Sequence, residues 1–349
     1  MQCNSFPAPC PLLFSADPLA TFGDLMASLS SGLLEQPAEI NDLPELLDRA
    51  YTYGDSDALL RVQQRLADVH ARSFEIPSSV PRTGLDTLRS DLHCALQIEE
   101  RMLSYEDRFI DHAACPSTSG GGLEFVRSLK SIVREHPANR HPFYIEFLPD
   151  SAEIGDIAYY LAQESALDPR FDDFIALMQI GMSVRPKLEL AGNYWDEMGN
   201  GTEPRVHTVM FQNALNEVGA TDDFIRENLS VDAMVCGNLS AMLALRRPLI
   251  FRAVGSFAVT EFLFPRRCAQ LLEAWRRNAL SVEGIEYHRE HIGIDARHAS
   301  GFFKNVIIPL VEERPEVAPE IYWGAVARLN SSQRYLDSTL QTLTYGSAR

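Results

Sequence analysis

The spacing of apolar residues constrains this chain more than any other feature. Apolar side chains recur every three or four positions over most of its length, as at Leu47, Ala50, Leu59 and Leu66. That period matches one face of an α-helix. No stretch alternates β-branched and polar residues as a sheet requires. The sequence therefore predicts an all-α fold. The expected amphipathic helices in the first part of the chain cover residues 19–34, 43–74, 86–113 and 123–133.

The charge balance excludes two classes of partner. Against 31 basic residues stand 48 acidic ones, and the formal net charge of -17 repels phosphate backbones and anionic lipid headgroups. We therefore expect no nucleic acid and no membrane as a partner. No apolar run reaches the roughly 20 residues that span a bilayer. The chain starts without a basic segment and its six cysteines form no CxxC pair, which predicts a cytoplasmic protein with reduced thiols.

Proline and helical periodicity divide the chain into three predicted segments. Residues 1–15 contain Pro7, Pro9 and Pro11 without an apolar period, and predict an irregular arm. Residues 16–140 predict an amino-terminal helical region. A proline-rich passage around Pro142 separates it from a main domain over residues 141–349, which contains the residues of chemical interest.

One predicted helix, over residues 281–308, carries a stripe of metal-ligand side chains. His291, Asp295 and His298 stand at positions i, i+4 and i+7, so two imidazoles and a carboxylate share one face. Imidazole and carboxylate together suit iron, manganese or zinc. A solvated helix face would carry the same residue types, and this motif alone does not decide between the two. His288 and Glu290 lie off the stripe and are expected at the surface or behind the ligands.

Two earlier segments supply what a dimetal site still lacks. Glu164 lies near the end of an apolar helical segment, just before Asp168. Further on, a Gly-Asn-Gly stretch breaks a helix after Glu197, and Thr202 can cap a new helix that carries His207. The six residues form the type of ligand set that holds two metals inside a helical bundle. The candidate ligands are Glu164, Glu197, His207, His291, Asp295 and His298.

The order of these residues resembles the haem-oxygenase-like diiron oxidases, over about residues 143–310. A ferritin-type fold is disfavoured, because the chain lacks a pair of Glu-x-x-His motifs. The resemblance implies a haem-oxygenase-like helical bundle over residues 141–349 and the same six ligands. It also implies two iron ions, dioxygen as co-substrate, an external electron donor and no haem. The amino-terminal helices are expected to form a homodimer, as in longer members of the family.

Substrate contacts are expected from the apolar segment before the three-ligand helix. Phe257 and Phe302 are candidates, although aromatic residues at helical spacing are more often core. Glu261 is a lone acid in an apolar helix. It either pairs with an arginine such as Arg185 or Arg252, the more frequent arrangement for a buried charge, or faces the cavity and binds a substrate amine.

Three functions are compatible with these residues. The first is a nonheme diiron oxygenase that N-oxygenates a small amine or amino acid in specialised metabolism. The ten-residue interval from Glu197 to His207 resembles the N-oxygenating members of the family, although some of those carry a carboxylate where this chain has His291. The second is a diiron oxidase that desaturates an aliphatic or amino acid or cleaves its C–C bonds. The third is a non-enzymatic helical interaction protein.

Overall fold

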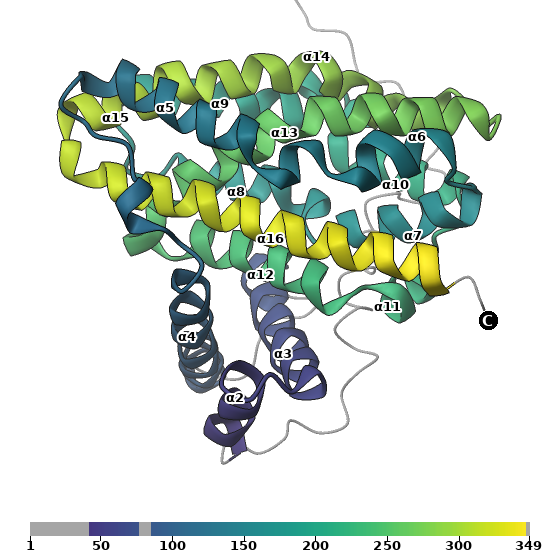
Figure 1. Ribbon diagram of the computed structural model, residues 1–349, viewed down its shortest axis with the longest axis horizontal. Helices are drawn as coiled ribbons and strands as arrows, with labels where there is room; N and C mark the ends of the chain where they lie inside the picture. The colour runs from purple at the N-terminus through teal and green to yellow at the C-terminus, as the bar shows by residue number, and fades with distance from the viewer. Residues whose placement is uncertain (1–41, 77–84, 347–349) are drawn as a thin grey trace, which may run out of the picture.

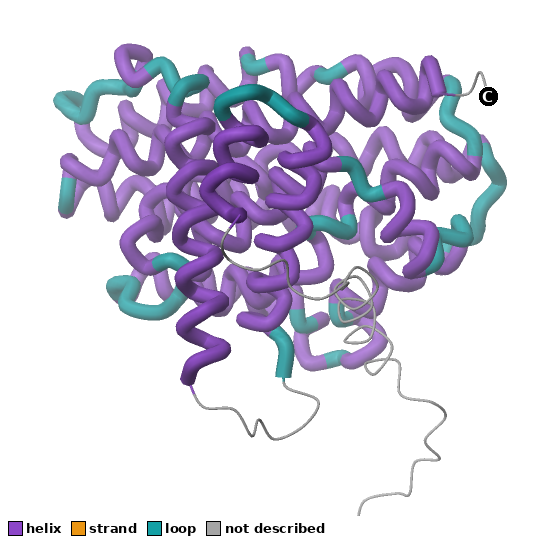
Figure 2. Tube along the Cα trace, turned by 90° about the horizontal axis from the view of Figure 1, so that it is seen from below, coloured by secondary structure: helices purple, strands orange, loops and turns teal. Residues whose placement is uncertain are grey.

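The computed structural model describes residues 42–76 and 85–346, and within these ranges it contains helices and no strand (Figure 2). The all-α fold predicted from the apolar period is confirmed. The irregular arm expected over residues 1–15 and the helix expected over residues 19–34 lie outside the described residues.

Three amino-terminal helices project from one side of the body (Figure 1). They are α2 (Leu43–Tyr51), α3 (Ser56–Phe74) and α4 (Leu85–Asp107). The segment expected as continuous helix over residues 43–74 is interrupted, because Gly54 adopts a left-handed φ of 70° and Asp55 then caps α3 by accepting from the amides of Asp57 and Ala58. α3 packs on α12 of the body, which fixes this region to the remainder of the protein.

The body is a bundle of helices, which are named here in chain order. They are α5 (Gly121–Glu135), α6 (Leu148–Asp150), α7 (Ile154–Glu164), α8 (Phe171–Met178), α9 (Val184–Glu197), α10 (His207–Glu217), α11 (Asp222–Asn228), α12 (Val231–Leu245), α13 (Ile250–Arg277), α14 (Glu286–Gly301), α15 (Ile308–Glu313) and α16 (Ala318–Tyr345). A π-helical turn, Phe302–Ile307, joins α14 to α15, as often occurs beside functional sites. The helix expected over residues 281–308 is therefore α14 with this turn, whereas that expected over residues 86–113 ends at Asp107.

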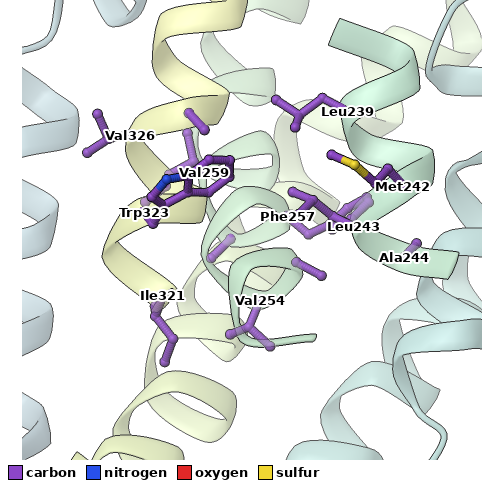
Figure 3. Packing of buried hydrophobic residues seen from close by; sticks show 14 of the residues in the cluster. Leu239, Met242, Leu243, Ala244, Val254, Phe257, Val259, Ile321, Trp323 and Val326 are labelled. Atoms are coloured by element: carbon purple, nitrogen blue, oxygen red, sulfur yellow. The ribbon is translucent and has the colours of Figure 1, made fainter. Parts of the chain in front are cut away.

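The long helices α13 and α16 pack against each other, and buried side chains of both meet in the hydrophobic cluster (Figure 3). A Cβ atom built on Gly255 would overlap the carbonyl oxygen of Ile321, and one built on Gly324 would overlap that of Arg252. The two backbones approach this closely only because both positions are glycine. Trp323 and Val254 pack beside this contact.

Two hydrophobic clusters fill the described part of the chain. One extends from α2 through α5 into α12, α13 and α16. The other lies among α7, α10, α13 and α14 and surrounds the candidate metal ligands. The domain boundary near residue 140 stays a prediction, although α5, from the predicted amino-terminal region, packs against α15 and α16 of the body.

One helix passes a length-and-composition test for a membrane span. Within the described residues it is Arg247–Arg277, which includes α13, and 67% of its apolar window is buried inside the fold. The core helix of a globular bundle has the same appearance.

Candidate metal centre

α14 presents its predicted stripe to the interior. His291, Asp295 and His298 are all buried, and they face residues contributed by α9, α10 and α13. The sequence pattern identified the correct face, because residues at i, i+4 and i+7 lie on one side of a helix.

The first ligand group consists of Glu197, His207 and His291, whose donor atoms lie within 4.8 Å of one another. Nδ1 of His207 lies 2.6 Å from Oε2 of Glu197, and the rings of His207 and His291 are 4.4 Å apart. Glu197 ends α9 as predicted. However, α10 begins at His207 itself and not at Thr202, where no side-chain cap forms.

The turn between α9 and α10 brings Glu197 and His207 together. Gly199, Asn200 and Gly201 all have left-handed φ values, of 60°, 53° and 79°. A Cβ at Gly199 would lie 2.5 Å from the carbonyl group of Arg205, so this position requires glycine for space as well as for conformation. The Gly-Asn-Gly stretch therefore folds the chain back sharply enough to place a helix end against a helix start.

The second ligand group consists of Glu261, Asp295 and His298, again within 4.8 Å. Nδ1 of His298 lies 3.5 Å from Oε2 of Glu261 and 3.7 Å from Oδ1 of Asp295. Burial lowers the pKa of His298, but the two carboxylates outweigh burial and raise that pKa to about 11.

Glu261 takes a different partner from the arginine that was expected. Arg185 donates to Asn305 and to the carbonyl of Lys304, and Arg252 pairs with Glu320. Glu261 accepts instead from Nδ2 of Asn193 at 2.5 Å and faces His298. The arginine pairing was wrong because Asn193 of α9 supplies an amide and His298 of α14 an imidazole to this acid. Glu261, expected to bind substrate, lies in the second candidate ligand group, and its part in substrate binding stays a prediction.

The residues present fit metal ions. Four buried atoms that could bind a metal have no hydrogen-bond partner among the described residues. They are Oε1 of Glu197, Nε2 of His207, Oδ1 of Asp295 and Nδ1 of His298. Buried polar atoms are normally paired, and a cation would pair with these.

Two side chains that the sequence reasoning did not assign orient the ligands. Nε2 of His298 donates to Oδ2 of Asp196 at 3.0 Å, which leaves Nδ1 for a metal. Asn193 holds Glu261 in the same way. Their position in the sequence could have indicated this role, because both residues lie on α9 within one turn of Glu197. His291 is fixed by its own helix, because its Nδ1 donates to the carbonyl of Tyr287 at 2.6 Å.

Glu164 lies beside the two ligand groups without joining either. It lines a small cavity of about 20 Å³ together with Glu261, His291 and Asp295, and accepts a hydrogen bond of 2.5 Å from the hydroxyl of Tyr335. Asp168, one helical turn further on, lines the same cavity, and its buried Oδ2 has no partner. Two carboxylates of this cavity are thus available to bind a metal. Only Glu164 was predicted as a ligand from the sequence.

The two predicted aromatic contacts are not part of this cavity. Phe257 packs against Phe171 and Phe174, and Phe302 is fully buried in the larger hydrophobic cluster. The structure thus places Phe257 and Phe302 in the core, as is usual for large apolar side chains, and their role in substrate binding stays an untested prediction. Phe171 lines the cavity instead.

The two residues expected off the stripe differ in their surroundings. Glu290 pairs with Arg205 near the surface. His288 is buried among aromatic rings, where neither ring nitrogen has a hydrogen-bond partner, and burial lowers its pKa to about 3. It is a neutral core residue and not the surface group that was one of its two expected roles.

Sequence comparison assigns the class. Residues 158–333 match the family of iron-containing redox enzymes, a range that contains both ligand groups, Glu164 and Asp168. The chain belongs to this haem-oxygenase-like, all-helical family, and the resemblance inferred from the ligand order is confirmed.

A more specific similarity covers part of the chain. Over 132 residues it is 29% identical to a nitrosourea synthase from Streptomyces achromogenes subsp. streptozoticus. The match spans 37% of this chain but only 28% of the length of that protein.

Proposed function

We propose that this protein is a nonheme diiron, dioxygen-dependent oxygenase that N-oxygenates a small amine or amino acid in specialised metabolism. The observation that carries the proposal is the two buried groups of carboxylates and imidazoles, several of whose oxygen and nitrogen atoms have no hydrogen-bond partner among the described residues. Membership in the iron-containing redox family favours iron as the metal. We further propose a cytoplasmic location, an external electron donor, and no nucleic acid or membrane partner.

The two ligand groups would each hold one iron ion. Glu197, His207 and His291 would bind the first, and Glu261, Asp295 and His298 the second. Glu164 or Asp168 would add a carboxylate from the cavity side. Iron with open coordination positions supplies the binding and reduction of dioxygen.

The chain's own residues prepare the centre in three ways. Asp196 and the Tyr287 carbonyl fix which nitrogen each imidazole offers. Asn193 orients one oxygen of Glu261. The apolar cluster around α14 excludes bulk water, which strengthens every charge interaction inside the centre.

Two observations support N-oxygenation over the other oxidations. His207 lies ten positions after Glu197, the interval that resembles the N-oxygenating members. The partial relative is named for the synthesis of a nitrosourea, a product with oxygen on nitrogen. Desaturation or C–C cleavage would use the same ligands and would differ in the product.

Anaerobic loading with ferrous iron tests the metal centre. We expect two irons per chain in the wild type and a clear deficit in His291→Ala, while His93→Ala, which alters an exposed histidine, binds as the wild type. A trace of iron in the wild type would favour the interaction-protein alternative. No haem is expected, so a Soret band in the purified protein would contradict the assignment.

Product analysis tests the reaction. Iron-loaded protein, dioxygen, a reductant and a panel of amines and amino acids should give a product that has gained oxygen on nitrogen, with the label from ¹⁸O₂. A product that has lost hydrogen or carbon without gaining oxygen would favour the desaturase or cleavage alternative.

A further inference from the structure

Two buried guanidinium groups line the cavity beside the candidate metal ligands. Arg267 comes from α13 and Arg328 from α16, and both contribute to the cavity that Glu261, His291 and Asp295 also line. Their exposed fractions are 5% and 4%. Arginine is rarely buried so completely unless it has an anionic partner.

Neither guanidinium has its hydrogen-bonding capacity satisfied. Nη1 of Arg267 donates to the hydroxyl of Tyr335 at 3.4 Å, and its Nε and Nη2 have no partner. Nη1 of Arg328 donates to Sγ of Cys236 at 2.5 Å, and its Nε has none. Within the described part of the chain neither forms an ion pair, and Arg267 lies over the ring of Tyr144.

The nearest acids do not account for these charges. Glu164 accepts from the hydroxyl of Tyr335, which therefore stands between that carboxylate and Arg267. Asp168 lies near Arg328 without a direct contact. Whichever of these acids binds iron gives up its charge to the metal, and one of the two arginines then lacks its nearest counter-ion in a buried site.

We propose that Arg267 and Arg328 bind the carboxylate of the substrate, so that the substrate is an amino acid and not a simple amine. This inference rests on the proposed function. The planar guanidinium fork matches a carboxylate with two parallel hydrogen bonds, which suits recognition in a buried cavity.

The same cavity also has an apolar side. Leu167, Phe171 and Phe264 line it together with the arginines and with Glu261, His291 and Asp295 of the candidate ligand groups. A second small cavity adjoins the first and shares Glu164, Leu167 and Arg328 with it. Because Glu261, His291 and Asp295 line the same cavity as the arginines, a substrate held by its carboxylate would lie beside the candidate metal ligands.

Equilibrium binding to the full-length, iron-loaded protein under anaerobic conditions tests the proposal. The probes are amino acids paired with the amines that lack only the carboxylate: L-lysine with cadaverine, L-leucine with isopentylamine and L-phenylalanine with phenethylamine. In at least one pair the acid should bind more tightly. In Arg328→Gln and Arg267→Gln the dissociation constant of that acid should rise about 10- to 100-fold, while binding of the amine stays unchanged.

Control variants distinguish a loss of carboxylate recognition from a folding defect. Arg185→Gln removes an arginine that bonds Asn305 outside the cavity and should bind the acid as the wild type does. Lysine at either position keeps the charge without the fork and should lose less affinity than glutamine, which separates charge recognition from a folding defect. Circular dichroism and iron content are measured on each sample.

The outcomes separate the two proposals. Failure of the wild type to bind iron overturns the proposed function, and the same binding panel can be measured on that metal-free protein. An acid preference that survives in both glutamine variants overturns the role of the arginines. Absence of a preference for any acid in the panel overturns the amino-acid assignment, and leaves Arg267 and Arg328 as groups that only neutralise Glu164 and Asp168.

Discussion

Replacing Asp196 by asparagine should weaken one metal site and spare the other. Oδ2 of Asp196 accepts from Nε2 of His298 at 3.0 Å, and Oδ1 accepts from Nδ2 of Asn200 at 3.1 Å. Burial raises the pKa of Asp196, but these hydrogen bonds outweigh burial and lower it overall, so the group is a carboxylate at neutral pH. An asparagine has one oxygen and cannot accept both bonds.

The expected loss follows from the role of such partners. Removing a carboxylate that orients a metal-bound imidazole typically costs 10- to 100-fold in metal affinity, or about 1.4 to 2.8 kcal/mol. Since Asp196 contacts His298 and not His207 or His291, the loss should fall on the site that contains Glu261.

Anaerobic titration of ferrous iron against a chromophoric chelator measures this loss. In a His207→Ala background, where the Glu261 site remains, Asp196→Asn should lower the affinity by the stated factor. In a His298→Ala background the same change should have little effect. Asp223→Asn, an exposed acid on α11, serves as the control substitution. Equal losses in both backgrounds would refute the assignment of Asp196 to His298.

Four further outcomes are expected. Hydrogen exchange over residues 290–303 should slow on iron binding, because the ligands of α14 are desolvated and incompletely compensated without a cation; equal protection in both forms would contradict this coupling. Iron binding near neutral pH should release at least one proton, since metal-free His298 has a pKa of about 11 and must lose its proton to offer Nδ1, and calorimetry in buffers of different ionisation enthalpy detects it; a heat independent of the buffer would count against this. Gly255→Ala should destabilise the protein by about 1 to 3 kcal/mol in denaturant titration through overlap with α16, whereas Gly192→Ala, with open space around it, should be neutral or stabilising. The homodimer stays a prediction: Leu88→Glu, on a face of α4 where four leucines are exposed, should shift sedimentation toward the monomer, and an unchanged profile would exclude this face.

The sequence by itself determined the features that depend on neighbours along the chain. Helical period, the His291, Asp295 and His298 stripe and the break after Glu197 are all local, because backbone geometry alone places residues a few positions apart. Five of the six predicted ligands accordingly fall in the two ligand groups.

Only the tertiary structure decided which helices supply each other's partners. Glu261 meets Asn193 and His298 instead of an arginine, because α14 packs against α13 and α9 reaches that side through Asn193. Glu164 and Asp168 are one turn apart, and their spacing in the sequence cannot show which of them reaches a metal. Arg267 and Arg328 converge on one cavity although 60 residues of chain separate them, since the close glycine contact of α13 and α16 brings those helices together. Contacts between distant helices depend on how their side chains pack, and a local pattern carries no information about that packing.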